Sequence, residues 1–537
     1  MSRPSGAKEI AGVLSGLILV TLAVLHRQAS DLYAVPDRGD PVFSMWRMAW
    51  VQHQLARDPW HLFDANIFHP LPAALTYSDA MILPAVAAAP LAGVGMHPVV
   101  AYNLTLLAAF ILSGLSAYLL VRGTGGGGVA AWITAVAFMI CPFRMNHLSH
   151  LELQMTMWMP IALLAVHRLL RDGERKFAVI LGAALAAQWY SSMYYGLFLT
   201  LFTVVFGAVL AGAWRAPRRR LMYAVGGAGL AACVVWPLVH VYIASTPARG
   251  IRHEGIVREF SAVPLDYLRP GVNNPAYRAF LPRVVEAERA LFPGVGSLVL
   301  AGVGAWPPLT ATRAGFIVAG TVAFDASLGL HGLLYPVLFR LAAPFRSIRV
   351  PARFGILVVL TIAVLAGAGA RRALERVRTP RGRAVLLAVF TTALMVDGWP
   401  RHNRVPMWRF PPEIYAALPK TGAVLFEFPV HAEPNRFEEN LPYMYFSMWH
   451  WTPMVNGYSG FNPPSYAAML QGTSGFPASS SLDYLAQSGV THIGVHCALW
   501  VADVCAATVD RLDATPRVRR IAQAKWYGDS SVLYELR

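Results

Sequence analysis

DLYAVPDRGDPVFSMWRMAWVQHQL, residues 31–55, and ANIFHPLPAALTYSD, residues 65–79, form the polar stretch around which the sequence is organised. One apolar segment precedes it, and most of the chain that follows is also apolar. Its six carboxylates are Asp31, Asp37, Asp40, Asp58, Asp64 and Asp79. An acidic, aromatic-rich loop between the first two spans of a membrane protein predicts that this loop carries the chemistry.

The composition is that of an integral membrane protein. Of the 537 residues, 56% are hydrophobic and only 14% are charged, whereas soluble domains have about 25% charged residues. The net charge of +16 comes from basic residues between apolar segments. We attribute it to membrane orientation and anionic lipid, and we expect no nucleic-acid partner.

Eleven segments are apolar over about the length of a membrane span. They cover residues 9–26, 98–121, 128–143, 154–170, 177–193, 195–213, 221–243, 294–312, 315–331, 352–370 and 384–398. A shorter run at 82–95 contains two prolines, Pro84 and Pro90, and predicts an interfacial or re-entrant helix.

The Lys and Arg clusters predict the orientation of these spans. They lie at 168–176, 215–220 and 371–383, and with 82–95 not crossing they fall on the side of the N-terminus, the cytoplasm. The first loop (27–80), the 141–154 turn, the loop at 244–293 and the 332–351 connection are then extracytoplasmic.

The sequence therefore predicts two domains. Residues 1–398 form the membrane domain, and residues 399–537 form a small exported α/β domain with strands at 424–430, 490–496 and 531–536 and a helix at 481–489. Cys497 and Cys505 lie in this second domain and can form a disulfide if it is exported.

Asp40 and Asp79 are the candidate catalytic carboxylates. Each has a structural alternative: Asp40 stands before Pro41, as an N-cap residue does, and Asp79 precedes the apolar run at 82–95. If they bracket one cavity, they suit general-base catalysis or binding of a divalent cation.

A second candidate group is HLSHLELQ, residues 147–154. On a helix, His150 and Gln154 lie one turn apart with His147 beside them, while Glu152 points nearly opposite. Metal binding by both histidines and Glu152 therefore needs a non-helical turn. The alternatives are hydrogen bonds to a polar substrate and solvated residues at the interface.

The third group is basic although it is predicted to be external. FRLAAPFRSIRVPARF, residues 339–354, includes Arg346, Arg349 and Arg353. Either the topology is locally wrong, or these guanidinium groups bind phosphate at the membrane surface. Arg249, Arg252 and Arg258 of the preceding long loop can join them. Tyr194, at an outer span end, belongs to an interfacial belt or stacks on a sugar.

Taken together, several motifs resemble the GT-C superfamily of polytopic glycosyltransferases. They are GDPVFSMW (39–46), NIFHP (66–70) followed by SD, HLSHLELQ (147–154), FRSIRVPARF (345–354) and VNGYSG (455–460). The resemblance spans nearly the whole chain. It implies a lipid-linked sugar donor, with Asp40 as the acid, Asp79 as a second carboxylate and the arginines holding the lipid phosphate.

The resemblance further implies where the protein acts and on what. A sugar would pass from a polyprenyl-phosphate donor to a glycan, lipid or protein acceptor at the outer face of a bacterial inner membrane, in one inverting displacement. Mg²⁺ or Mn²⁺ would be held by Asp40, Asp79 and Glu152, although the chain lacks the acidic pair that the family has after its first span. The alternative is a non-catalytic assembly or transport protein for cell-surface polysaccharide.

Overall fold

The structure, a computed structural model, describes residues 6–277, 280–283, 286–401, 403–430 and 437–537. Its contacts divide the chain into two compact units. We call the first the helical unit; it contains Met1–Leu32, Asn103–His240 and Ile251–Arg404. We call the second the mixed unit; it contains Tyr33–Tyr102, Val241–Gly250 and Val405–Arg537.

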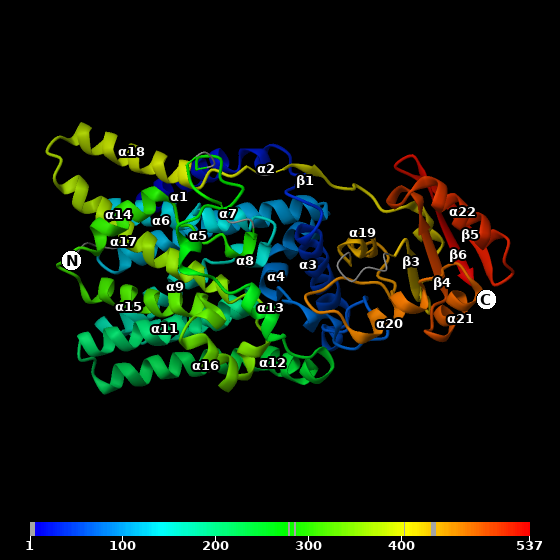
Figure 1. The fold of residues 1–537 in the computed structure, drawn as a ribbon. Helices are drawn as coiled ribbons and strands as arrows, with labels where there is room; N and C mark the ends of the chain where they lie inside the picture. Colours follow the sequence, from blue (N-terminus) through cyan, green and yellow to red (C-terminus); the bar gives the residue numbers. More distant parts are fainter. Residues whose placement is uncertain (1–5, 278–279, 284–285, 402, 431–436) are drawn as a thin grey trace. The chain divides into compact units, whose positions relative to one another are not determined.

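Each of the eleven predicted spans overlaps a helix (Figure 1), although the helix in the predicted span 294–312 ends at Ala305. These are α1 (Ala7–Val24), α5 (Pro98–Gly123), α6 (Gly128–Met139), α9 (Trp158–Asp172), α10 (Lys176–Ser191), α11 (Met193–Ala213), α12 (Arg218–Arg249), α14 (Val295–Ala305), α15 (Ala311–Ser327), α17 (Gly355–Glu375) and α18 (Pro380–Asp397). Within the described residues, seven helical stretches are long and apolar enough to cross a membrane. The chain is a multi-pass membrane protein, and the count of eleven spans stays a prediction.

Shorter helices connect these long ones in the helical unit. They are α2 (His26–Ser30), α7 (Pro142–Asn146), α8 (Leu151–Gln154), α13 (Glu254–Glu259) and α16 (Leu334–Leu341).

Helix α17 is the most buried candidate span, and α14 packs against it at backbone distance. A Cβ atom on Gly304 of α14 would lie 1.8 Å from the carbonyl oxygen of Leu365, and one on Gly369 of α17 would lie 1.9 Å from that of Leu300. Only glycine fits at these two positions, because any Cβ atom would overlap the backbone of the facing helix. Small residues at such positions let the backbones of membrane helices touch.

The mixed unit combines the first loop with the C-terminal part of the chain. The first loop supplies β1 (Ala34–Val35), α3 (Asp40–Arg57) and α4 (Ile82–Gly93). Strand β1 pairs with β2 (Val405–Pro406), with Ala34 opposite Pro406. The short helix expected at 82–95 is present as α4. The predicted boundary between residues 398 and 399 stays a prediction.

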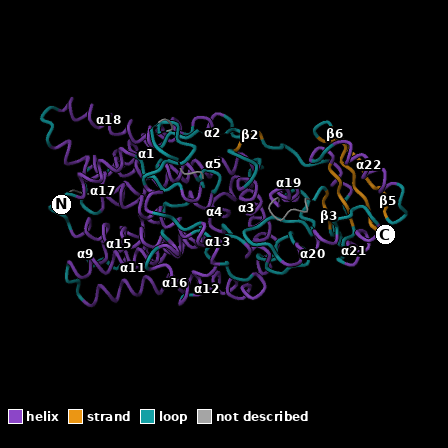
Figure 2. The backbone as a smooth tube through the Cα atoms, in the orientation of Figure 1, coloured by secondary structure: helices purple, strands orange, loops and turns teal. Residues whose placement is uncertain are grey.

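The C-terminal part folds around a four-stranded sheet, whose strands are orange in Figure 2. The strand order is β3-β4-β6-β5. The strands are β3 (Leu425–Phe428), β4 (His492–His496), β5 (Val518–Trp526) and β6 (Asp529–Leu536). Strands β3 and β4 are parallel, and the other pairs are antiparallel. The helices are α19 (Leu441–Ser447), α20 (Pro464–Gly472), α21 (Ser479–Gln487) and α22 (Ala502–Asp513). The three predicted strands and the predicted helix are confirmed, and β5 is an addition.

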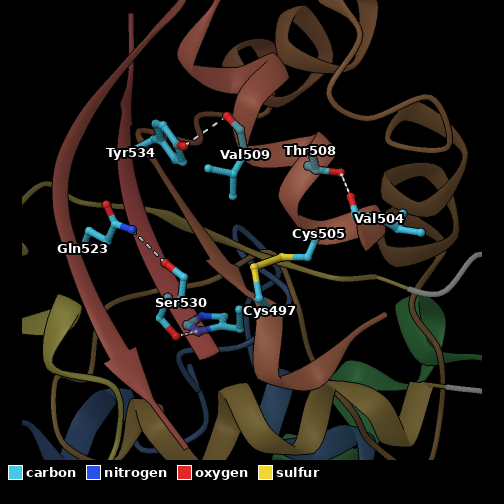
Figure 3. The surroundings of a disulfide bond; sticks show 10 residues. Cys497, Val504, Cys505, Thr508, Val509, Gln523, Ser530 and Tyr534 are labelled. Carbon is cyan, nitrogen blue, oxygen red and sulfur yellow. Dashed lines mark hydrogen bonds between the residues drawn. A yellow bond between two sulfur atoms is a disulfide. The ribbon is translucent and has the colours of Figure 1, made fainter. Parts of the chain in front are cut away.

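Cys497 and Cys505 form a disulfide (Figure 3). Cys497 follows β4, and Cys505 lies on α22 and is fully buried. The bond therefore ties α22 to the end of a central strand. The predicted disulfide is confirmed.

Replacing both disulfide cysteines by alanine is expected to lower the free energy of unfolding by about 2–3 kcal/mol, because a short loop is no longer closed in the unfolded chain. Thermal unfolding of the full-length protein in detergent measures this, and reductant should lower the transition of the wild type but not that of the double variant. Cys233→Ala, which removes a free cysteine, is the control. Equal transitions for the wild type and the double variant would contradict the expectation.

Candidate functional site

The predicted site residues fall into two groups, one in each unit. Asp40 and Asp79 lie in the mixed unit. The helical unit contains His147, His150, Glu152, Gln154, Tyr194, Arg252, Arg258, Arg346, Arg349 and Arg353. The expectation that the acid and the arginines converge stays a prediction.

Asp40 is the first residue of α3 and is half-buried. The N-cap residue is Gly39, and no side chain caps this helix. The Gly39 N–H instead donates to Asp37 Oδ1 at 2.8 Å. The alternative that Asp40 is the N-cap is therefore wrong. Its carboxylate lies in the first turn, where the helix dipole favours a negative charge.

The aromatic residues of α3 fix this helix against the loop that follows it. Trp46 is fully buried, and its indole N–H donates to Asn66 Oδ1 at 3.2 Å. The indole N–H of Trp50 donates to the Leu62 carbonyl at 2.9 Å. These two tryptophans hold α3, and with it the backbone of Asp40, in a fixed position.

Asp79 lies two residues before the N-cap of α4, which is Met81, and no side chain caps that helix either. The alternative that Asp79 is a cap is therefore wrong as well. Its backbone carbonyl accepts a hydrogen bond from Arg47 Nη1 at 3.0 Å. Arg47 is 1% exposed, donates from Nη2 to Ser44 Oγ at 3.0 Å and lies 4.3 Å from the Phe43 ring centroid.

Glu288, which the sequence did not single out, is the centre of the group in the helical unit. Its carboxylate is buried and accepts from Arg353 through both oxygens, with Nε 2.8 Å from Oε2. His147 Nε2 lies 3.2 Å from the same Oε2, and Nδ1 lies 2.8 Å from the Phe143 carbonyl. Both ring nitrogens of His147 therefore face acceptors, the Glu288 carboxylate on one side and a backbone carbonyl on the other.

The pKa of Glu288 reflects opposing causes. Burial alone would raise it, but the charge of Arg353 and the hydrogen bonds from His147 and Arg353 outweigh burial and hold the pKa well below its ordinary value. Glu288 is therefore ionised and neutralises buried positive charge.

The predicted phosphate-binding arginines differ in how they are held. Arg353 is buried in the ion pair with Glu288, 5.4 Å from the Tyr194 ring. The side chain of Arg349 is 38% exposed, 4.0 Å from Glu288 Oε1, and its backbone N–H donates to the Tyr194 hydroxyl at 3.0 Å. Arg349 therefore presents the more accessible guanidinium.

Arg346 and Arg252 lie on two different connections, which a backbone hydrogen bond joins. The Arg346 carbonyl accepts from the Arg252 N–H at 2.9 Å, and Arg346 Nη2 donates to the Arg340 carbonyl at 3.3 Å. Arg258 is exposed on α13. Binding of phosphate by any of these arginines stays a prediction.

The 141–154 connection is not one helix. His147 ends α7, and His150 is the N-cap residue of α8. The break brings His150 Nδ1 within 3.8 Å of Glu152 Oε1, which a continuous helix would separate. Among the described residues, no group of three His, Cys, Asp or Glu side chains is arranged to hold a metal ion.

Gln154 and Arg144 hold this broken connection together. Arg144 is fully buried, and its Nε donates to Gln154 Oε1 at 3.1 Å. Gln154 Nε2 donates to the His147 carbonyl at 2.7 Å. Gln154, predicted to bind substrate, is itself fully buried and makes its bonds within the connection. It thereby fixes the backbone that carries His147.

Three residues of these networks were missed from the sequence: Arg47, Arg144 and Glu288. The two arginines interrupt apolar runs, MWRMAW and PFRMN, and a charge in such a run needs a buried partner. That signal was available. Glu288 lies among other charged residues in a loop, so nothing local distinguishes it.

The comparisons with known proteins rest on structure. No family model and no curated protein matches the sequence. The cryo-EM structure of the arabinofuranosyltransferase AftD from Mycobacteria is similar over 99% of this chain, with a TM-score of 0.61 and 15% identity. The crystal structure of ArnT from Cupriavidus metallidurans in the apo state is similar over 98% of it, with a TM-score of 0.50 and 14% identity.

The chain has the GT-C fold. The resemblance noted in the sequence is therefore confirmed for the fold. The chain spans 40% of the AftD chain and 97% of the ArnT chain. At this identity the GT-C fold is what the likeness establishes, and the activity is a matter for proposal.

Proposed function

We propose that this protein is a membrane glycosyltransferase that moves a hexosyl or pentosyl group from a polyprenyl-phosphate donor to a cell-envelope acceptor. The similarity of 98–99% of the chain to two GT-C glycosyltransferases is the observation that carries the proposal. The reaction takes place at the outer face of a bacterial inner membrane, with the N-terminus in the cytoplasm and the C-terminal domain outside. The disulfide supports an oxidising location for that domain.

Asp40 acts as the general base in this proposal. It takes the proton from an acceptor hydroxyl, whose oxygen forms a bond to the anomeric carbon while the bond from that carbon to the phosphate oxygen breaks. Attack opposite the leaving group inverts the anomeric configuration. The lipid phosphate leaves with the bonding electrons.

Arginines stabilise the leaving phosphate. Arg349 has the accessible guanidinium, and Arg346, Arg252 and Arg258 supply further positive charge. Glu288 acts indirectly: it holds Arg353 beside Tyr194, whose hydroxyl binds the Arg349 backbone. Preorganised cations of this kind stabilise developing charge without reorganising.

The residues predicted to bind Mg²⁺ or Mn²⁺ do not form a ligand set within one unit. Asp40 and Asp79 lie in the mixed unit and Glu152 in the helical unit, and the described residues hold no group of three ligands. The proposed mechanism therefore assigns no step to a metal, and a metal requirement stays a prediction that chelation by EDTA would test.

Purified protein in nanodiscs, given polyprenyl-phosphate donors with radiolabelled sugars and an envelope extract as acceptor, tests the proposed function. We expect release of polyprenyl phosphate and labelled acceptor. If the protein is a non-catalytic assembly or transport protein, the label stays on the donor in every combination of donor and acceptor.

Arg349→Gln is expected to raise the KM for the donor about 10- to 100-fold, because a charged hydrogen bond to phosphate contributes about 1.5–3 kcal/mol. The matched control is Arg376→Gln, an exposed arginine beyond α17 on the predicted cytoplasmic side. Equal donor KM values in the two variants would remove Arg349 from donor binding.

A further inference from the structure

We propose that Arg47, Tyr242 and Arg249 are positioning residues that fix Asp79 by binding the backbone of the turn that carries it. Three carbonyl oxygens of this turn are held from outside. Arg249 Nη1 donates to the Thr76 carbonyl at 2.8 Å, the Tyr242 hydroxyl to the Ser78 carbonyl at 2.6 Å and Arg47 Nη1 to the Asp79 carbonyl at 3.0 Å. We call these three side chains the carbonyl clamp. The proposal rests on the proposed function and on the sequence-based prediction that Asp79 is its second catalytic carboxylate.

The turn itself needs external support. It contains one 3₁₀ turn, Ala74–Tyr77, between Ala73 and Met81. Both flanking residues have a φ of 51°, a left-handed backbone that costs a residue other than glycine about 1–3 kcal/mol. A conformation with such a cost persists only where the surroundings select it. The carbonyl clamp supplies donors that fit this backbone and no extended one.

The clamp residues are themselves immobilised. Arg47 is buried against Phe43, as described above, and Tyr242 is 8% exposed. The Arg249 guanidinium lies 5.6 Å from the Tyr242 ring centroid and 5.0 Å from that of Phe461. Two planar cations packed on aromatic rings hold their direction better than solvated side chains, because their rotamers are fixed by packing.

Helices α12 and α3 supply the carbonyl clamp, and on each helix the residues concerned lie on one face. Tyr242 and Arg249 lie two turns apart at the end of α12, within the mixed unit. Arg47 lies two turns after Asp40 in α3. Helix α3 therefore carries Asp40 at its first residue and, on the same face, the guanidinium that holds the Asp79 backbone. A single rigid helix sets the spacing between the two candidate carboxylates.

Tyr242→Phe removes one hydroxyl and is the sharpest test. We expect kcat to fall about 10- to 100-fold with an unchanged KM for the donor, since a small displacement of a reacting group has an effect of this size. The control is Tyr223→Phe, at the other end of α12, where the hydroxyl binds exposed Arg219; it should keep wild-type rates.

A double-mutant cycle separates positioning from a general structural role. In the Asp79→Asn background, Tyr242→Phe should cost no further activity, because the group that it positions is already absent. Arg249→Lys, which keeps the charge but loses the planar fork, should give the same result. An equal loss in both backgrounds, or no loss in either, overturns the proposal.

Hydrogen exchange gives a reading that does not depend on turnover. The amides of residues 74–79 should exchange faster in Tyr242→Phe than in the wild type, while those of α3 stay protected. Unchanged exchange overturns the carbonyl clamp even if transfer is never detected. If exchange rises as expected but Asp79→Asn keeps full activity, the clamp exists and the role assigned to Asp79 is what fails.

Discussion

Asp40→Asn is expected to abolish sugar transfer, with kcat lower by about 10²- to 10⁴-fold, the contribution of a positioned general base. Asparagine keeps the size of the side chain but cannot accept a proton. Because Asp40 does not cap α3, no capping hydrogen bond is lost, and the lost interaction with the helix dipole contributes about 0.3–1 kcal/mol. Initial rates in nanodiscs and thermal unfolding of the same samples measure both effects.

The matched control is Asp58→Asn, which removes a carboxylate of the same loop. Asp58 Oδ2 lies 2.7 Å from His61 Nδ1 in an exposed pair, so its loss should change neither rate nor stability appreciably. Wild-type turnover in folded Asp40→Asn protein would take Asp40 out of the mechanism. A change in donor KM alone would assign it to binding.

Glu288→Gln is expected to destabilise the protein by about 3–5 kcal/mol, because it leaves the buried charge of Arg353 without a counter-ion. Unfolding transitions in detergent measure this loss. Glu375→Gln is the control: it breaks a Glu–Arg pair whose side chains are 59% and 51% exposed, and an exposed pair contributes less than about 1 kcal/mol. The double variant Glu288→Leu/Arg353→Met should be more stable than Glu288→Leu alone, since it removes the buried cation together with its partner.

The pH dependence of Glu288 has a definite sign. Its pKa in the folded protein lies below the ordinary value, so at acidic pH the unfolded chain binds more protons than the folded one. Its stabilisation is present above the ordinary glutamate pKa of about 4.3 and is lost as the pH falls below it. The acid-induced loss of stability should therefore be shallower in Glu288→Gln than in the wild type. Identical slopes would contradict this assignment.

The elements could be predicted from the sequence wherever one local pattern decides them. Apolar length located the long helices, and short runs rich in apolar, strand-forming residues located β3, β4 and β6. Strand β5 was missed because its burial pattern is mostly exposed, so RRIAQAK offers no apolar face. The pairing of Ala34 with Pro406 joins residues far apart in sequence, and local hydropathy contains no information about such pairs.

The same limit applies to the site. Asp40 and Asp79 were located as the ends of helix-flanking turns, but their N-cap alternatives failed because neighbouring residues take that position. The arginines of 346–353 were noticed for their charge. The partner of Arg353 is Glu288, 65 residues away in sequence, and nothing in periodicity or spacing encodes that pair.

The glycine contact between α14 and α17 has a consequence for how the proposed polyprenyl-phosphate donor would reach the protein interior. The main chains of α14 and α17 touch at Gly304 and Gly369. At these positions no side chain between the helices can change rotamer, so we expect the two helices to stay together. We expect the isoprenoid tail of that donor to enter between other helices, where larger side chains can change rotamer and allow lateral access from the bilayer.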